Sequence, residues 1–395
     1  MARLKSRRKL WLKVHLGLGL VLGLVLSVWG VTGSIWVFGQ EIDEWLNPEL
    51  LTVVPPTNSA RHLSFAELQE YAEFSMPDKA ELISVTYPRN SVAALDLEFS
   101  VSTGSGVIEI WQIGINPYTA AITGKRLMQR SRQWLPETFM GFVHALHPSL
   151  LHLAGGVPAG IMACLILFSI LTGLILWWPL TGKWRQALTI KRRSSIERFN
   201  YDLHKTTGFY TAIVLFVILL SGISMVVPKY FVGLVEIFSP ATYRYFFKST
   251  PRQDMPSIEL SRILTTVNAR YPSGRLQWIY AAPEVTDAYF VCKNDVDIAG
   301  SWLQRVCMAI DRYTGEFLDI DDPSRAKGGE IFMQWQWPLH SGQAFGMLGR
   351  ILVFVTGLFC PMLYITGVIR WLQKRRAACG VKERFAKISR GSCDA

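Results

Sequence analysis

The chain has 395 residues, half of them hydrophobic, and a formal net charge of +11 at pH 7. This apolar composition excludes an ordinary soluble protein. Of the 41 Lys and Arg residues, 21 fall in three short stretches, 1–14, 181–205 and 370–395, and each stretch borders an apolar segment. Membrane topology explains such a charge distribution, so we exclude a nucleic-acid partner.

Four apolar segments reach the roughly 20 residues that cross a bilayer as a helix. They cover residues 14–38, 155–179, 208–227 and 349–372. The first has too long an apolar run for a signal peptide and no small-residue cleavage site follows it, so we expect an uncleaved anchor. Because Lys and Arg concentrate on the cytoplasmic side, we expect both termini and the 181–205 loop in the cytoplasm. Residues 39–148 and 228–340 would then lie outside.

The two outer segments share one order of predicted elements. In each, a stretch with helical spacing, SFAELQEYAEF or SIELSRILTTVNAR, precedes runs that alternate in the manner of strands. Their last hairpins also match, INPYTAAITG in one and IDRYTGEFLDI in the other. Each outer segment is therefore predicted to be a small α+β module, one helix packed on an antiparallel sheet.

The whole chain reads as a tandem duplication of helix, outer module and helix. The predicted fold is a membrane protein with a four-helix transmembrane bundle and two periplasmic α+β modules. The expected divisions are 1–38 (N-terminus and first helix), 39–148 (first module), 149–180 (second helix), 181–205 (basic loop), 206–227 (third helix), 228–340 (second module), 341–372 (fourth helix) and 373–395 (basic tail).

Six of the seven histidines lie at the predicted ends of membrane helices. His15 and His204 fall at cytoplasmic ends, and His144, His147, His152 and His340 fall at outer ends. His15 and His204 each precede a Thr-Gly or Ser-Gly pair by the same interval. Ionisable residues at membrane depth are costly and usually functional. A single interfacial histidine is more simply explained as a snorkelling or capping side chain, so the interpretation depends on pairing across the duplication.

A pseudo-twofold axis between the halves would bring His15 opposite His204 and His147 opposite His340. Two facing imidazoles in a helical bundle suit bis-histidine ligation of haem iron. Gly19 and Gly208 follow the inner histidines by four residues, on the same helix face, and would leave room for a flat macrocycle.

The outer ligand of the first half stays open at this stage. Pro148 follows His147, so His144 or His152 could replace it. A metal site built on His144 and His147 at helical spacing is a weaker alternative, because few carboxylates lie nearby.

Several chemistries have no visible motif in the sequence. It contains no P-loop, no dinucleotide-binding glycine motif in a strand-to-helix context, no nucleophile elbow and no zinc-protease motif. Cys292 and Cys307 fall on consecutive predicted strands and could form a disulfide in an oxidising compartment. Strand register decides that pairing, so the disulfide also stays open.

Together, the motifs NPYTAAITG, DRYTGEF, HLGLG, HKTTG, LTGLILWWP and PLHSGQAFGMLGR resemble those of PepSY-associated transmembrane proteins, the iron-regulated or iron-uptake membrane proteins of bacteria. Within that family, the chain is most similar to inner-membrane ferric-siderophore reductases that bind two b-type haems. The resemblance implies an oxidoreductase with two haem b groups, a ferric siderophore as substrate and a cytoplasmic electron donor. The chain departs from the family at LAGGVPAG, where relatives more often carry a Gly-Arg pair such as Gly349-Arg350.

We therefore expect a transmembrane electron conduit, with an inner haem on His15 and His204 and an outer haem on His147 and His340. One alternative is a regulatory protein whose outer modules bind a peptide or protease. Another is a permease for siderophore or haem, although a parallel duplication with four helices is unlike the inverted repeats of many transporters. The siderophore, the donor and the oligomeric state stay open.

Overall fold

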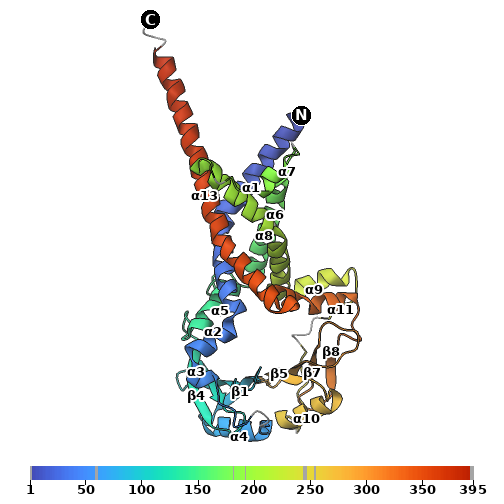
Figure 1. Cartoon of the computed structure of the whole chain (residues 1–395). Coiled ribbons are helices and arrows are strands. Elements are labelled where there is room, and N and C mark those ends of the chain that lie inside the picture. Colours follow the sequence, from blue (N-terminus) through green and yellow to red (C-terminus); the bar gives the residue numbers. More distant parts are fainter. Residues whose placement is uncertain are drawn as a thin grey trace. The chain divides into compact units, whose positions relative to one another are not determined.

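The computed structural model describes residues 2–57, 61–180, 182–191, 193–242, 247–252 and 255–391, and the side chains of 2–6 and 378–391 are outside this description. The chain forms two compact units, and most of their elements are labelled in Figure 1. The helical unit comprises Met1–Val37, Leu146–Pro228 and Trp335–Ala395. The sheet unit comprises Phe38–Ala145 and Lys229–Gln334. Each unit thus combines segments from both halves of the sequence.

The helical unit contains four helices long and apolar enough to cross a membrane, as the sequence predicted. They are α1 (Ala2–Val37), α6 (Val157–Trp177), α8 (Ile196–Val226) and α13 (Gly346–Gly391), and the shorter elements of this unit are α7 (Trp184–Leu188), α12 (Gln336–Ser341) and η2 (Gln343–Phe345). Helix α8 starts well before the apolar run at 208. The Ser195 side chain caps its N-terminus by accepting a hydrogen bond from the backbone N–H of Arg198 at 3.3 Å. The first turns of α8 contain charged residues, so hydropathy alone does not locate the start of this helix.

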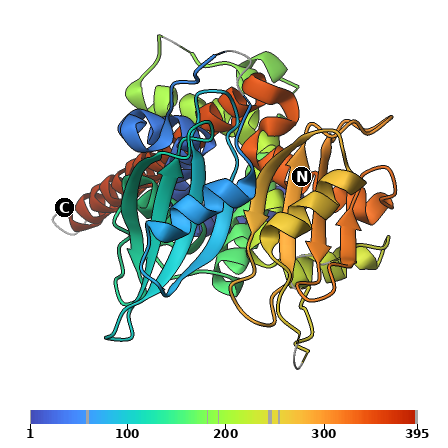
Figure 2. The same ribbon diagram turned by 90° about the horizontal axis from the view of Figure 1, so that it is seen from below.

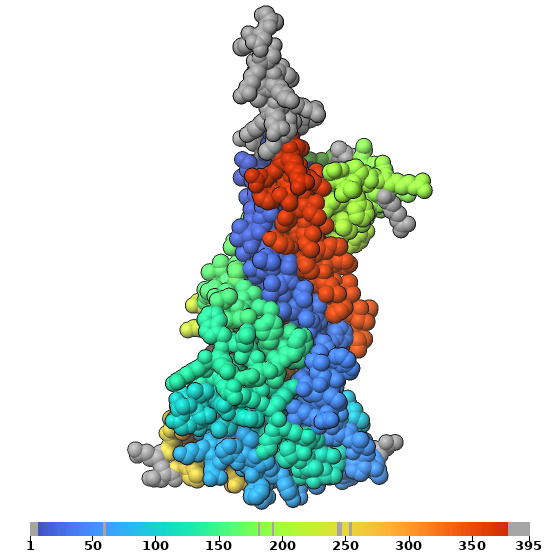
Figure 3. Space-filling view, turned by 90° about the vertical axis from the view of Figure 1, so that its left-hand side faces the viewer, coloured from blue at the N-terminus to red at the C-terminus, as the bar shows by residue number. Residues whose placement is uncertain are grey.

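The four long helices pack as a ring of neighbours. Helix α1 contacts α6 and α13, and α8 contacts the same two helices, so α1 and α8 occupy diagonal positions. Figure 3 shows α1 and α13 side by side. Small residues permit this close approach: a Cβ added to Gly357 would lie 2.4 Å from the carbonyl oxygen of Gly30. Nearby, the Ser34 hydroxyl donates a hydrogen bond to the carbonyl of Phe354 at 2.7 Å.

The sheet unit holds one antiparallel sheet in the order β4-β3-β2-β1-β5-β6-β7-β8. The strands are β1 (Ala80–Thr86), β2 (Leu95–Ser102), β3 (Ile108–Ile115), β4 (Ile122–Arg130), β5 (Arg275–Tyr280), β6 (Tyr289–Asn294), β7 (Arg305–Ile310) and β8 (Phe317–Asp321). The two expected modules are therefore joined into a single sheet by the pairing of β1 with β5, in which Val85 lies opposite Ile279. This pairing covers two strand edges that separate modules would expose.

Helices α4 (Phe65–Phe74) and α10 (Leu260–Arg270) cover one face of the sheet, one helix over each half (Figure 2). Every second residue of β2 is buried beneath these helices, as expected for a strand with one face on the core. Three of them are fully buried: Leu95, Leu97 and Phe99. The N-terminus of α4 is fixed by a capping box between Ser64 and Glu67. The other helices with residues in this unit are α2 (Gly39–Leu46), α3 (Pro48–Leu51), α5 (Phe139–Ser149), α9 (Pro228–Glu236) and α11 (Gly328–Gln334).

The two matching hairpins have matching turns. In the first, Oδ1 of Asn116 accepts a hydrogen bond from the backbone N–H of Tyr118 at 2.9 Å. In the second, Oδ1 of Asp311 accepts one from Tyr313 at the same distance. Four residues after each of these side chains the backbone is left-handed, with φ of 58° at Ala120 and 73° at Gly315. The similarity of INPYTAA and IDRYTGE thus reflects a shared turn.

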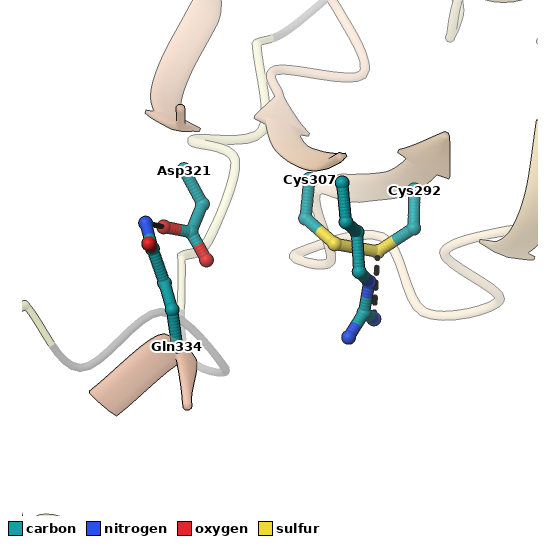
Figure 4. Close-up of a disulfide and its surroundings, with 5 residues drawn as sticks. Cys292, Cys307, Asp321 and Gln334 are labelled. Atoms are coloured by element: carbon teal, nitrogen blue, oxygen red, sulfur yellow. Dashed lines mark hydrogen bonds between the residues drawn. A yellow bond between two sulfur atoms is a disulfide. The ribbon is translucent and has the colours of Figure 1, made fainter. Parts of the chain in front are cut away.

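The disulfide that the sequence left open is present. Cys292 of β6 and Cys307 of β7 are register partners with a Cα–Cα distance of 4.1 Å, and their sulfur atoms are bonded (Figure 4). In the same view, Gln334 of α11 donates a hydrogen bond to Asp321 of β8 at 2.5 Å. The first contact joins two strands of the second half of the sheet, and the second joins helix α11 to the edge strand β8.

Candidate functional site

The structure brings four histidines together in two pairs within the helical unit. The ring centres of His15 on α1 and His204 on α8 are 6.3 Å apart, with an angle of 73° between the ring planes. Those of His147 on α5 and His340 on α12 are 6.1 Å apart, with an angle of 61°. We call these the inner pair and the outer pair.

Three histidines were candidates for the first-half member of the outer pair, and His147 is the one beside His340. His152 is exposed in the loop that follows α5. His144 lies three residues before His147 on α5, in the part of that helix that belongs to the sheet unit.

His15 is oriented by the neighbouring helix α6. Its Nδ1 lies 3.0 Å from the carbonyl oxygen of Ser169 and 3.2 Å from the hydroxyl oxygen of Thr172. The Thr172 hydroxyl donates its own proton to the Ser169 carbonyl at 2.8 Å. Both oxygens therefore act as acceptors toward the ring, and this assigns the imidazole proton to Nδ1.

The other three histidines are held in the same way, each by a Thr or Ser hydroxyl of a membrane helix. The Nδ1 contacts are His204 with Leu363 O (3.1 Å) and Thr366 Oγ1 (2.9 Å), His147 with Thr32 Oγ1 (3.0 Å), and His340 with Ile218 O (2.9 Å) and Ser221 Oγ (3.2 Å). Metal-ligating histidines commonly donate one ring N–H to a protein acceptor while the other nitrogen coordinates the metal. In all four histidines, Nε2 is therefore the ring nitrogen that would coordinate a metal.

The glycine after each of these hydroxyl residues lies against the ring itself. A Cβ built on the glycine would meet the histidine Cε1 at 2.8 Å for Gly33 and His147, 3.0 Å for Gly173 and His15, 3.2 Å for Gly222 and His340, and 3.4 Å for Gly367 and His204. The sequence showed two of these pairs, Thr32-Gly33 and Ser221-Gly222, at the same interval after His15 and His204. It did not reveal that each pair supports a histidine of another helix.

Helices α1 and α8 each take part in both pairs. His15 of α1 belongs to the inner pair, and Thr32, 17 positions later, holds the outer His147. His204 and Ser221 of α8 repeat this spacing. At a rise of 1.5 Å per residue, the two levels are about 25 Å apart along either helix. This separation fits within the ~30 Å hydrocarbon core of a bilayer.

A cavity of about 480 Å³ opens beside the inner pair, lined mainly by apolar side chains of α1, α6, α8 and α13 together with both histidines. Gly19 and Gly208, the two glycines expected to leave room for a macrocycle, also line it. A Cβ on Gly19 would have no atom within 4 Å, and one on Gly208 would meet only Leu363, at 3.6 Å. The volume is typical of a small-molecule or cofactor site.

The spacing within each pair fits one metal ion between two imidazoles. Two metal–nitrogen bonds of about 2 Å, plus about 1 Å from each nitrogen to its ring centre, require roughly 6 Å between ring centres. Among the residues that the structure describes, no group of three or more His, Cys, Asp or Glu side chains could hold a metal. A metal between two histidines would need further ligands, and a porphyrin would supply four nitrogens.

The comparisons with known proteins agree with this architecture. The sequence model of a family described as "PepSY-associated TM region" matches residues 12–374. The matched range contains all four paired histidines, the residues that hold them and the eight strands. No curated protein matches the chain.

Proposed function

The chain belongs to the PepSY-associated TM family, and we propose that it is a di-haem electron-transfer protein of the bacterial inner membrane. Its substrate would be a ferric siderophore in the periplasm, whose Fe(III) it reduces to Fe(II). The observation that carries the proposal is the pair of histidine sites, with ring centres 6.3 and 6.1 Å apart and every Nδ1 engaged with a helix acceptor.

His15 and His204 would hold one haem b, and His147 and His340 the other. Each bound haem supplies a one-electron carrier at its iron. The Thr and Ser hydroxyls and the helix carbonyls keep each Nδ1 protonated, which leaves the Nε2 lone pair for iron. Hydrogen bonding at Nδ1 also increases the basicity of the ligating nitrogen.

The direction of the reaction follows from charge. The inner pair lies near the basic stretches 181–205 and 370–395, which the positive-inside rule assigns to the cytoplasm. For each Fe(III) reduced, one electron would leave a cytoplasmic donor and one chelated iron outside would gain it. Lowering the charge of the iron weakens its bonds to hard oxygen ligands, which favours release from the siderophore. Helices α1 and α8, present at both levels, would hold the two sites at a constant separation.

An absorption spectrum of the full chain, purified after haem-replete expression, tests the haem sites. We expect a Soret band, two haems per chain by pyridine haemochrome, and the sharp visible bands of six-coordinate low-spin haem after reduction with dithionite. A protein without a Soret band would contradict the proposal and favour the peptide-binding alternative.

A second measurement tests the reaction. Dithionite-reduced protein, freed of excess reductant and mixed with a ferric hydroxamate chelate under anaerobic conditions, should return to the oxidised spectrum as Fe(II) appears. Haem that stays reduced in the presence of both hydroxamate and catecholate chelates would argue against a siderophore reductase.

A further inference from the structure

The cavity beside the inner pair has a basic end. Four cationic side chains line it, Lys205 of α8 and Arg370, Lys374 and Arg375 of α13. The three from α13 follow Gly367, which contacts His204, by three to eight residues. They therefore lie beyond the inner pair along α13, in the direction of the C-terminus.

Lys205 already has an anionic partner. Its ammonium lies 3.1 Å from Oδ1 of Asp202, a buried carboxylate whose other oxygen is 2.9 Å from Arg198. It also donates a hydrogen bond to the carbonyl of Gln186 at 2.5 Å. Lys205 thus shares the carboxylate of Asp202 with Arg198.

The three cations of α13 differ in this respect. Among the side chains that the structure describes, Arg370, Lys374 and Arg375 have no carboxylate within 4.0 Å. Arg370 lies over the ring of Tyr201 at 5.2 Å, and Arg375 over that of Trp371 at 5.0 Å. Aromatic contacts orient a guanidinium without neutralising it. Glu197 of α8 interacts electrostatically with Arg370 from a longer distance, so the three cations together give the basic end a net positive charge toward an anionic ligand in the cavity.

We infer that Arg370, Lys374 and Arg375 bind the carboxylates of the porphyrin in the inner site. This inference rests on the proposed function and extends it by giving the cofactor an orientation. The macrocycle would place its two propionates toward the basic end of the bundle and its apolar edge toward Gly19, Gly23 and Leu215, which line the same cavity. Arg370 and Lys374 share one face of α13 because they are four residues apart. Carboxylates form strong charge-assisted hydrogen bonds with such groups.

Anionic lipid headgroups are a second source of negative charge at this depth. The test therefore compares haemin, which carries two free propionates, with haemin dimethyl ester, which carries none. Both are titrated into haem-free His340→Ala protein, in which only the inner pair is complete, reconstituted in neutral phosphatidylcholine vesicles. We expect haemin to bind roughly tenfold more tightly than the diester. The triple variant Arg370→Gln/Lys374→Gln/Arg375→Gln should lose this preference.

A charge-matched control separates local binding from the overall charge of the protein. Lys191→Gln/Arg193→Gln/Arg376→Gln removes the same number of positive charges, three, from residues that do not line the cavity. This variant should keep the preference for haemin. If the triple variant is obtained in low yield, the midpoint potential of the inner haem is measured in the single variant Arg370→Gln. This potential should fall, because a nearby positive charge favours the reduced state.

The outcomes distinguish this inference from the proposed function. Equal binding of haemin and its diester to the parent protein would overturn the inference and leave the haem site intact. The same conclusion follows if the triple variant keeps the preference and the potential does not move. The titration is repeated in vesicles that contain anionic lipid. If the parent and the triple variant differ only in these vesicles, the three cations bind lipid headgroups, and the inference is overturned. Failure of the parent to bind either porphyrin would instead contradict the proposed function.

Discussion

The inner and outer histidine pairs have similar ring spacing and the same mode of support, but the chain reaches them differently. His15 and His204 lie within the long uninterrupted helices α1 and α8. His147 and His340 lie on α5 and α12, short helices that end before the membrane helices α6 and α13 begin. The inner pair thus lies on long regular helices, and the outer pair lies on short helices that a turn separates from the membrane helices.

The turns that follow α12 and α5 differ in their backbone conformations. After α12, Gly342 takes a left-handed conformation, with φ of 77°, and a Cβ there would lie 2.5 Å from the carbonyl oxygen of Gly349, so glycine is required. After α5, three residues with side chains, Leu150, Leu151 and His152, have φ of 48°, 57° and 68°. A left-handed conformation costs such residues of order 1–3 kcal/mol each. The two members of the outer pair therefore precede turns of different backbone strain, and the turn after His147 is the less favourable one.

Replacing single histidines should have the largest effect, because each pair should lose its haem separately from the other. His15→Ala or His204→Ala should lower the haem content from two per chain to one and leave the outer haem. His147→Ala or His340→Ala should leave the inner haem instead. Pyridine haemochrome counts and redox titration would distinguish the two remaining centres. His62→Ala, an exposed residue of the sheet unit, is the control and should keep both haems. A single alanine that removes both haems would show that the pairs are not independent sites.

Filling the inner cavity should abolish the inner haem alone. Gly19→Leu would place a side chain in the cavity that Gly19 lines. Gly17→Leu, two residues earlier on α1, is the matched control, because a Cβ on Gly17 would also meet no atom within 4 Å but Gly17 does not line the cavity. Haem content should fall to one per chain in the first variant and stay at two in the second. Two haems in Gly19→Leu would mean that the macrocycle does not use this cavity.

A graded effect is expected from the glycines that contact the rings. Gly33→Ala would bring a Cβ within 2.8 Å of His147. It should weaken the binding of the outer haem by about 1–3 kcal/mol, the usual cost of overpacking. Gly367→Ala would approach His204 only to 3.4 Å, an ordinary contact, and should weaken the inner haem much less. Competition of each variant with apomyoglobin for haem measures both. The reverse order of effects would contradict the assigned contacts.

The smallest effect should come from relieving the strained turn after α5. Leu151→Gly should stabilise the left-handed conformation by about 1 kcal/mol. The outer haem should then be retained to a higher temperature, while the inner haem is unchanged. Leu153→Gly, at a nearby exposed position without positive φ, is the control and should give no gain. An equal gain in both variants would mean that the strain at Leu151 does not limit the outer site.

The sequence by itself determined the elements and most of the pairing. Hydropathy located the four membrane helices, because an apolar run of sufficient length is a local property. Alternation located the strands of both halves, and helical spacing located α4 and α10. The repeated positions of His15 and His204, and of His147 and His340, predicted the partners that the structure brings together. Family membership, confirmed over residues 12–374, followed from the same motifs.

Only the tertiary structure decided which distant residues meet. The pairing of β1 with β5 merged two expected modules into one sheet, and a free strand edge does not specify its partner in the sequence. Register placed Cys292 opposite Cys307. His147, of the three candidates, lies beside His340, and helix packing placed the Thr-Gly and Ser-Gly pairs against the rings. Each outcome depends on contacts across many residues of chain, and local periodicity carries no information about them.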